Sequence, residues 1–68
     1  MKKIVRIKAD SEGVLSYNEL VHATELAQQN LVDIIVVFEK REHERRFRDK
    51  ANIAFPGINF STISVPMT

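Results

Sequence analysis

The densest group of charged side chains lies in residues 39–50, directly after an apolar run at 32–38. Within this segment Arg41, Arg45 and Arg48 recur at spacings of three and four residues, which would place them on one face of a helix. Guanidinium groups bind carboxylates and phosphates through paired hydrogen bonds. We therefore predict that these arginines contact a partner. The cations that flank them are Lys40, Arg46 and Lys50.

The charge of this segment is nearly balanced. It holds six basic and four acidic residues, a net of +2, and the whole chain has a net charge of +1. Helices that bind nucleic acid usually have a larger basic excess, whereas acidic and basic residues three or four apart also stabilise a helix that only faces solvent. A solvated helix with internal ion pairs is thus the simplest interpretation. Among functional ones we favour a protein partner, and the alternative is binding of a DNA or RNA phosphate backbone.

Oxygen-bearing side chains also follow the expected strands. Asp10, Ser11 and Glu12 come after the first strand and Glu39 comes after the second, so they would meet at the carboxyl edge of the sheet, where a divalent cation could bind. The same residue types are ordinary turn formers. The chain has no glycine-rich phosphate loop, and no serine or cysteine is placed beside a histidine by spacing. We predict a protein that is not an enzyme and has no metal or cofactor.

The size of the chain limits its stability. Its 68 residues make a single domain, 1–68, without cysteine, and a domain of this size buries only ~60% of its unfolded surface. A partner subunit could supply the missing stability. Arg6 and Lys8 interrupt the apolar residues that a secretory signal needs, and no run approaches the ~20 apolar residues that span a bilayer. We expect a cytoplasmic protein without a membrane segment.

The elements that would position these residues begin with a strand at residues 3–9, where apolar and charged side chains alternate. Ser16 and Glu19 have the spacing of a capping box, which predicts a helix from residue 17, and Asn30 is suited to a left-handed helix end. Residues 32–38 are typical of a strand covered on both faces. The buried stripe of the first helix is expected to comprise Tyr17, Leu20, Val21, Thr24, Ala27 and Leu31.

The charged segment predicts a second helix that ends before Pro56 and Gly57. Its apolar stripe is thin, and we expect His43, at the edge of that stripe, to pack on the sheet with its ring nitrogen hydrogen-bonded. The stripe comprises His43, Phe47, Ala51 and Ala54.

Residues 58–65 predict a third strand with a change of phase. Ile58 and Phe60 alternate in one register, whereas Ile63 and Val65 alternate in the other, and a bulge near Ser61 and Thr62 would reconcile the two. The proline at position 66 suits an edge strand.

These elements predict an α/β fold, a small two-layer β-α-β-α-β domain with a three-stranded, mainly parallel sheet and two helices. We place residues 32–38 at the centre and both helices on one face. The other face would then be bare, which predicts a homodimer that packs through the sheet or an edge strand. An alternative puts the first strand at the centre with one helix on each face, and it needs no dimer.

The function predicted from these features is a small regulatory binding module that acts through protein–protein interaction at the arginine-rich helix. Its compactness and lack of catalytic motifs resemble small accessory proteins, such as those of phages or bacterial regulatory systems, that modulate a larger machine. Phe47 would anchor the helix to the core.

Overall fold

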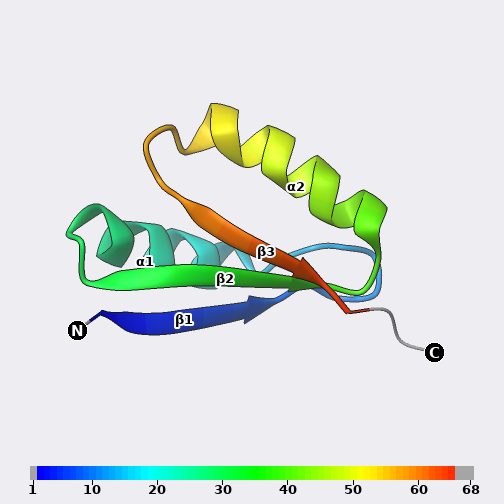
Figure 1. Ribbon diagram of the computed structural model, residues 1–68, viewed down its shortest axis with the longest axis horizontal. Helices are drawn as coiled ribbons and strands as arrows, with labels where there is room; N and C mark the ends of the chain where they lie inside the picture. The colour runs from blue at the N-terminus through cyan, green and yellow to red at the C-terminus, as the bar shows by residue number, and fades with distance from the viewer. Residues whose placement is uncertain (1, 66–68) are drawn as a thin grey trace.

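The computed structural model describes residues 2–65, which form the five expected elements in the order β-α-β-α-β (Figure 1). All three strands are parallel and form one sheet in the order β1-β2-β3. Helix α1 packs on β1 and β2, and helix α2 packs on β2 and β3. The protein is a small α/β domain. Its elements are β1 (Lys3–Lys8), α1 (Tyr17–Gln28), β2 (Val32–Phe38), α2 (Arg41–Ala54) and β3 (Phe60–Ser64).

Strand β2 is central, and both helices cover the same face of the sheet. Ile34 and Phe38 of β2 are almost fully buried on that face, in one cluster with Ala23 of α1. The ring of Phe47 on α2 lies 5.5 Å from the ring of Phe38, measured between centroids. The predicted strand order and helix placement are therefore confirmed, and the alternative with the first strand at the centre is wrong.

The opposite face of the sheet has no helix over it among residues 2–65. Ile35 and Val37 of β2 lie on this face and are only half-buried. The continuous apolar pattern of β2 predicts that both faces are covered, and residues 2–65 cover only the face that carries the helices, as the predicted helix placement requires. We refer to this side of the sheet as the open face. Its apolar side chains are Ile4, Ile35, Val37, Ile63 and Val65.

Strand β3 contains no bulge. Its register with β2 is uninterrupted from the Ile34–Phe60 pair to the Phe38–Ser64 pair, and the strand begins at Phe60 instead of Ile58. The change of phase in the sequence has a different cause, because β3 has apolar side chains on both faces: Phe60 packs towards the helices and Ile63 lies on the open face. The proline predicted to mark a sheet edge, Pro66, lies outside the described residues.

Helix α1 begins and ends where the sequence predicts, but only its C-terminal end has the predicted capping interaction. Ser16 is the N-cap, with φ −65° and ψ 120°, but its side chain makes no capping hydrogen bond, so the predicted capping box is not formed. At the other end Asn30 has φ 62°. The amides of Asn30 and Leu31 donate to the carbonyls of Ala27 and Leu26, both at 3.0 Å, which is the Schellman pattern.

The buried stripe of α1 is narrower than predicted. Ala23 and Thr24 are its buried residues, and the Thr24 hydroxyl donates to the Val21 carbonyl at 2.8 Å. These small side chains let the helix lie close to the sheet. Tyr17 is 75% exposed and Leu31 is also exposed, so their expected place in the buried stripe is wrong. Neither helix of the described residues has the length and apolar character that would let it cross a bilayer.

Candidate functional site

Helix α2 exposes most of its side chains. Of its 14 residues, Ala51 alone is buried. Arg41, Arg45 and Arg48 are exposed, and their spacing puts them on one face of the helix. Arg48 borders a separate small pocket beside Phe60 of β3. These three residues are called the arginine stripe below, and the stripe lies on the side of α2 that is turned away from α1.

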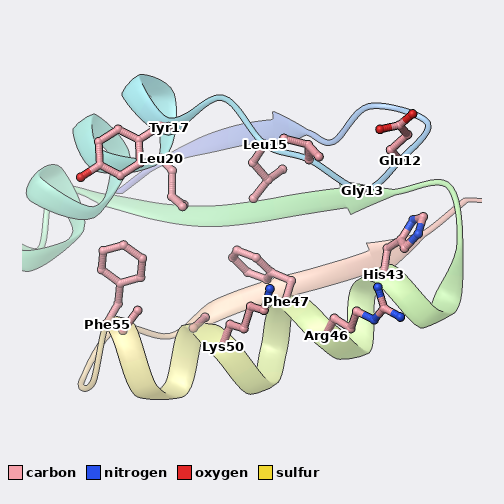
Figure 2. Close-up of a pocket in the computed structure, with 13 residues that line it drawn as sticks. Glu12, Gly13, Leu15, Tyr17, Leu20, His43, Arg46, Phe47, Lys50 and Phe55 are labelled. Atoms are coloured by element: carbon pink, nitrogen blue, oxygen red, sulfur yellow. The ribbon is translucent and has the colours of Figure 1, made fainter.

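The three flanking cations do not join the arginine stripe. Lys40 is the N-cap residue of α2 and is exposed. Arg46 and Lys50 line a groove on the side of α2 that faces α1 (Figure 2). Each helical residue is rotated by ~100° from the one before it, so Arg46 points well away from Arg45. The predicted six-residue surface is thus divided into the stripe, the N-cap residue Lys40 and a separate pair.

The groove lies between α2 on one side and residues 12–20 on the other, above the central strand. It has a volume of about 370 Å³. It exists because α1 lies over β1 and β2 while α2 lies over β2 and β3. The side chains of the two walls point towards one another across it (Figure 2). Its apolar lining includes Leu15, Tyr17 and Leu20 from the first wall and Phe47, Ala54 and Phe55 from the second.

At one end of the groove, His43 of α2 packs against Gly13 in the loop after β1 (Figure 2). Gly13 has φ +81°, and a Cβ atom built on it would lie 2.5 Å from Cγ of His43. The Nδ1 atom of His43 is buried and has no hydrogen-bond partner among the described residues. The expected hydrogen bond of a His43 ring nitrogen is therefore not formed at Nδ1, and the ring packs on the loop after β1.

The α2 wall is held to the sheet by two kinds of contact. The ring of Phe47 lies 5.5 Å from that of Phe38 and 5.2 Å from that of Phe60, between centroids, the second in an edge-on arrangement. The hydroxyl of Thr62 on β3 donates a 2.6 Å hydrogen bond to the carboxylate of Glu44. Phe47 thus anchors α2 as predicted, and a polar contact that the sequence did not indicate supports it.

The acidic residues of the candidate cation site either line different hollows or accept hydrogen bonds from the backbone. Each of the amides of Glu12 and Val14 donates a 2.9 Å hydrogen bond to the Asp10 carboxylate, which shapes the loop. Asp10 and Glu39 border a shallow depression beyond the carboxyl ends of β1 and β2, whereas Glu12 lines the groove instead. Within residues 2–65, no group of three or more possible ligands is arranged to hold a metal ion.

No side chain of α2 is in an ion pair with another side chain of residues 2–65. Among residues 2–65 the one ion pair joins Nζ of Lys2 to Oδ1 of Asp33 at 3.7 Å, away from α2. An exposed pair of this kind contributes little to stability. The internal ion pairs expected along the second helix are therefore not formed, and its guanidinium groups can bind an external anion without first losing an internal partner.

The groove combines an apolar lining with cations on one wall, an arrangement suited to binding. Sequence reasoning did not find it. The sequence held one indication of the groove: the spacing of His43, Lys50 and Ala54 places them on one face of a helix. The opposite wall comes from residues 12–20, and nothing in its sequence indicates that it faces α2. No protein-family model, curated protein or solved structure matches this chain.

Proposed function

We propose that this protein is a non-enzymatic binding module that regulates a larger assembly by binding an acidic surface of a protein partner. The arginine stripe on α2 makes the principal contacts. The stripe is formed by Arg41, Arg45 and Arg48, and Lys40 is a separate exposed cation at the start of the same helix.

One observation supports this proposal above the others: the arginines of the stripe are exposed and lack an acidic partner at ion-pair distance among the described residues. An exposed guanidinium group that already holds a carboxylate must release it before it binds another. The arginines of α2 have no such cost, and the planar guanidinium geometry favours paired hydrogen bonds to the carboxylates of a partner.

We also propose that the protein is a homodimer that acts in the cytoplasm. The support for the dimer is the open face, where Ile63 is 45% and Val65 is 52% exposed beside the half-buried Ile35 and Val37. A second copy that covers these side chains would remove apolar surface from water. The dimer leaves α2 accessible, because the helices lie on the other face of the sheet.

The experiment that tests the protein-binding function uses two variants of equal charge change on the same helix. In the first, Arg41→Glu and Arg45→Glu reverse two charges of the arginine stripe. In the second, Arg46→Glu and Lys50→Glu reverse the two cations that face the groove. Both are immobilised and exposed to lysate of the native host, and the captured proteins are identified by mass spectrometry. Circular dichroism confirms that both variants are folded.

We expect the first variant to lose a protein that the wild type captures, and the second variant to retain it. Capture that is equal for all three forms would contradict a role for the arginine stripe. Binding to random DNA or RNA that falls steeply with the logarithm of salt concentration would instead favour phosphate recognition. Nuclease treatment of the lysate separates these outcomes, because a direct protein partner stays bound after the nucleic acid is removed.

A further inference from the structure

The proposed function does not use the groove between α2 and residues 12–20. We propose that it binds a small amphipathic carboxylate, a free molecule with an apolar body and one anionic head. The body lies between the apolar walls, and the head lies against Arg46 and Lys50.

The size and lining of the groove fit the apolar body. Its volume of about 370 Å³ is at the lower end of the ~300–1,000 Å³ found for pockets that hold small molecules. Phe47 and Phe55 contribute aromatic surface from one wall, and Leu15 and Leu20 contribute aliphatic surface from the other (Figure 2). An apolar body that enters the groove is removed from water together with these side chains, which is the main source of its affinity.

The charged side chains of the groove favour a ligand with an anionic head group. Arg46 and Lys50 are four residues apart on one helix, so their Cβ atoms are ~5–6 Å from each other and both side chains can contact a single carboxylate. Neither is in an ion pair among residues 2–65. Glu12 lines the end of the groove near Gly13. Its charge repels an anion there, so the head stays at the cation pair and the apolar body extends towards Phe55.

This proposal does not depend on the arginine stripe. Arg46 and Lys50 line the groove, whereas the stripe lies on another side of α2. The two surfaces can therefore be inactivated separately, and loss of one binding activity gives no information about the other.

The probes are decanoate and decylammonium, which share an apolar chain and differ in the sign of the head group. Each is titrated below its micelle concentration into isotopically labelled full-length protein, and amide and methyl signals are followed by NMR. We expect decanoate to give saturable shifts at Leu20, Phe47, Ala51 and Phe55. We expect decylammonium to bind at least about tenfold more weakly, because its head meets two like charges.

Two pairs of variants locate the site. Arg46→Glu with Lys50→Glu should weaken decanoate binding at least about tenfold, since two charge-assisted contacts are lost. Arg41→Glu with Arg45→Glu should change it about twofold or less at physiological salt, because exposed charges outside the groove are screened.

The second pair blocks the groove itself. Ala54 is exposed and lines the groove, so Ala54→Trp should fill one end and abolish saturable binding without loss of fold. Ile53 is its neighbour, is 84% exposed and lies outside the groove, so Ile53→Trp should leave binding unchanged.

Four results would overturn the proposal. Equal affinity for decanoate and decylammonium would mean that the groove does not select charge. Saturable shifts confined to Ile35, Val37 and Ile63 would place the apolar chain on the open face instead. Shifts that never saturate, or that are the same in the Ala54→Trp variant, would mean that the groove is not a site.

Discussion

The imidazole ring of His43 lies against the α carbon of Gly13, with Nδ1 of the ring only 2.7 Å from the place where a Cβ atom on Gly13 would be. This contact joins the first turn of α2 to the loop that leads into α1. It closes one end of the groove (Figure 2). A glycine is needed there for two reasons, the positive φ of +81° and the lack of space for a side chain.

The first prediction is that Gly13→Ala destabilises the protein by about 2–4 kcal/mol. About 1–2 kcal/mol comes from the left-handed backbone of a residue with a Cβ atom, and the rest comes from displacement of the His43 ring and of α2 with it. The free energy of unfolding, measured by urea denaturation, checks this value.

The same substitution in a His43→Ala background separates the backbone contribution to the lost stability from the contribution of the contact with His43. With the ring removed, Gly13→Ala should cost only about 1–2 kcal/mol, the backbone term alone. A cost that is identical in both backgrounds would show that the close contact with His43 contributes nothing.

The second prediction concerns the anchor of α2. Phe47→Ala removes a ring that contacts both Phe38 and Phe60 and should cost about 3–5 kcal/mol. A domain of this length has a total stability of about 3–10 kcal/mol, so α2 should lose much of its protection in hydrogen exchange. Ile53→Ala, on the same helix at a residue that is 84% exposed, should change stability by less than about 0.5 kcal/mol. Equal effects of the two substitutions would mean that Phe47 is not the anchor.

The third prediction concerns the hydrogen bond from Thr62 to Glu44, a 2.6 Å contact that joins β3 to α2. Thr62→Val keeps the shape of the side chain but leaves the half-buried carboxylate of Glu44 without its donor, which should cost about 1–3 kcal/mol. Thr62→Ser retains the hydroxyl and should recover most of this loss. Thermal denaturation of the three proteins gives the comparison, and a valine variant as stable as the serine variant would contradict the prediction.

The fourth prediction tests the proposed dimer. Sedimentation at micromolar concentration should show a dimer for the wild type and a monomer for Ile63→Lys, because a charge on the open face opposes its burial against a second copy. Ile53→Lys places the same charge on the helical side of the molecule and should leave the dimer intact. A wild type that sediments as a monomer would rule out the dimer.

Most of the fold could be predicted because local patterns and simple packing rules agree. Val32–Phe38 forms β2 with the predicted limits, since a short β-branched run has few alternatives. The order of the strands followed from placing the most apolar one at the centre. The change of phase in residues 58–65 predicts a bulge, and this prediction is wrong because the register of β3 is uninterrupted. Phe60 and Ile63 instead lie on opposite faces of a regular strand.

The candidate site could be predicted only in part. Periodicity placed Arg41, Arg45 and Arg48 on one face of α2, where they are exposed. It did not separate Arg46 and Lys50 from them as residues that line a groove, because spacing along one helix does not show what lies beside that helix.

The sequence by itself determined which segments are strands and helices and which arginines share a face, because these properties depend on residues a few positions apart. Only the tertiary structure decided that Gly13 meets His43 and that residues 12–20 form a second wall opposite α2. Those contacts join residues about 30 positions apart, and they depend on how two helices are spaced across a sheet, a distance that no local pattern specifies.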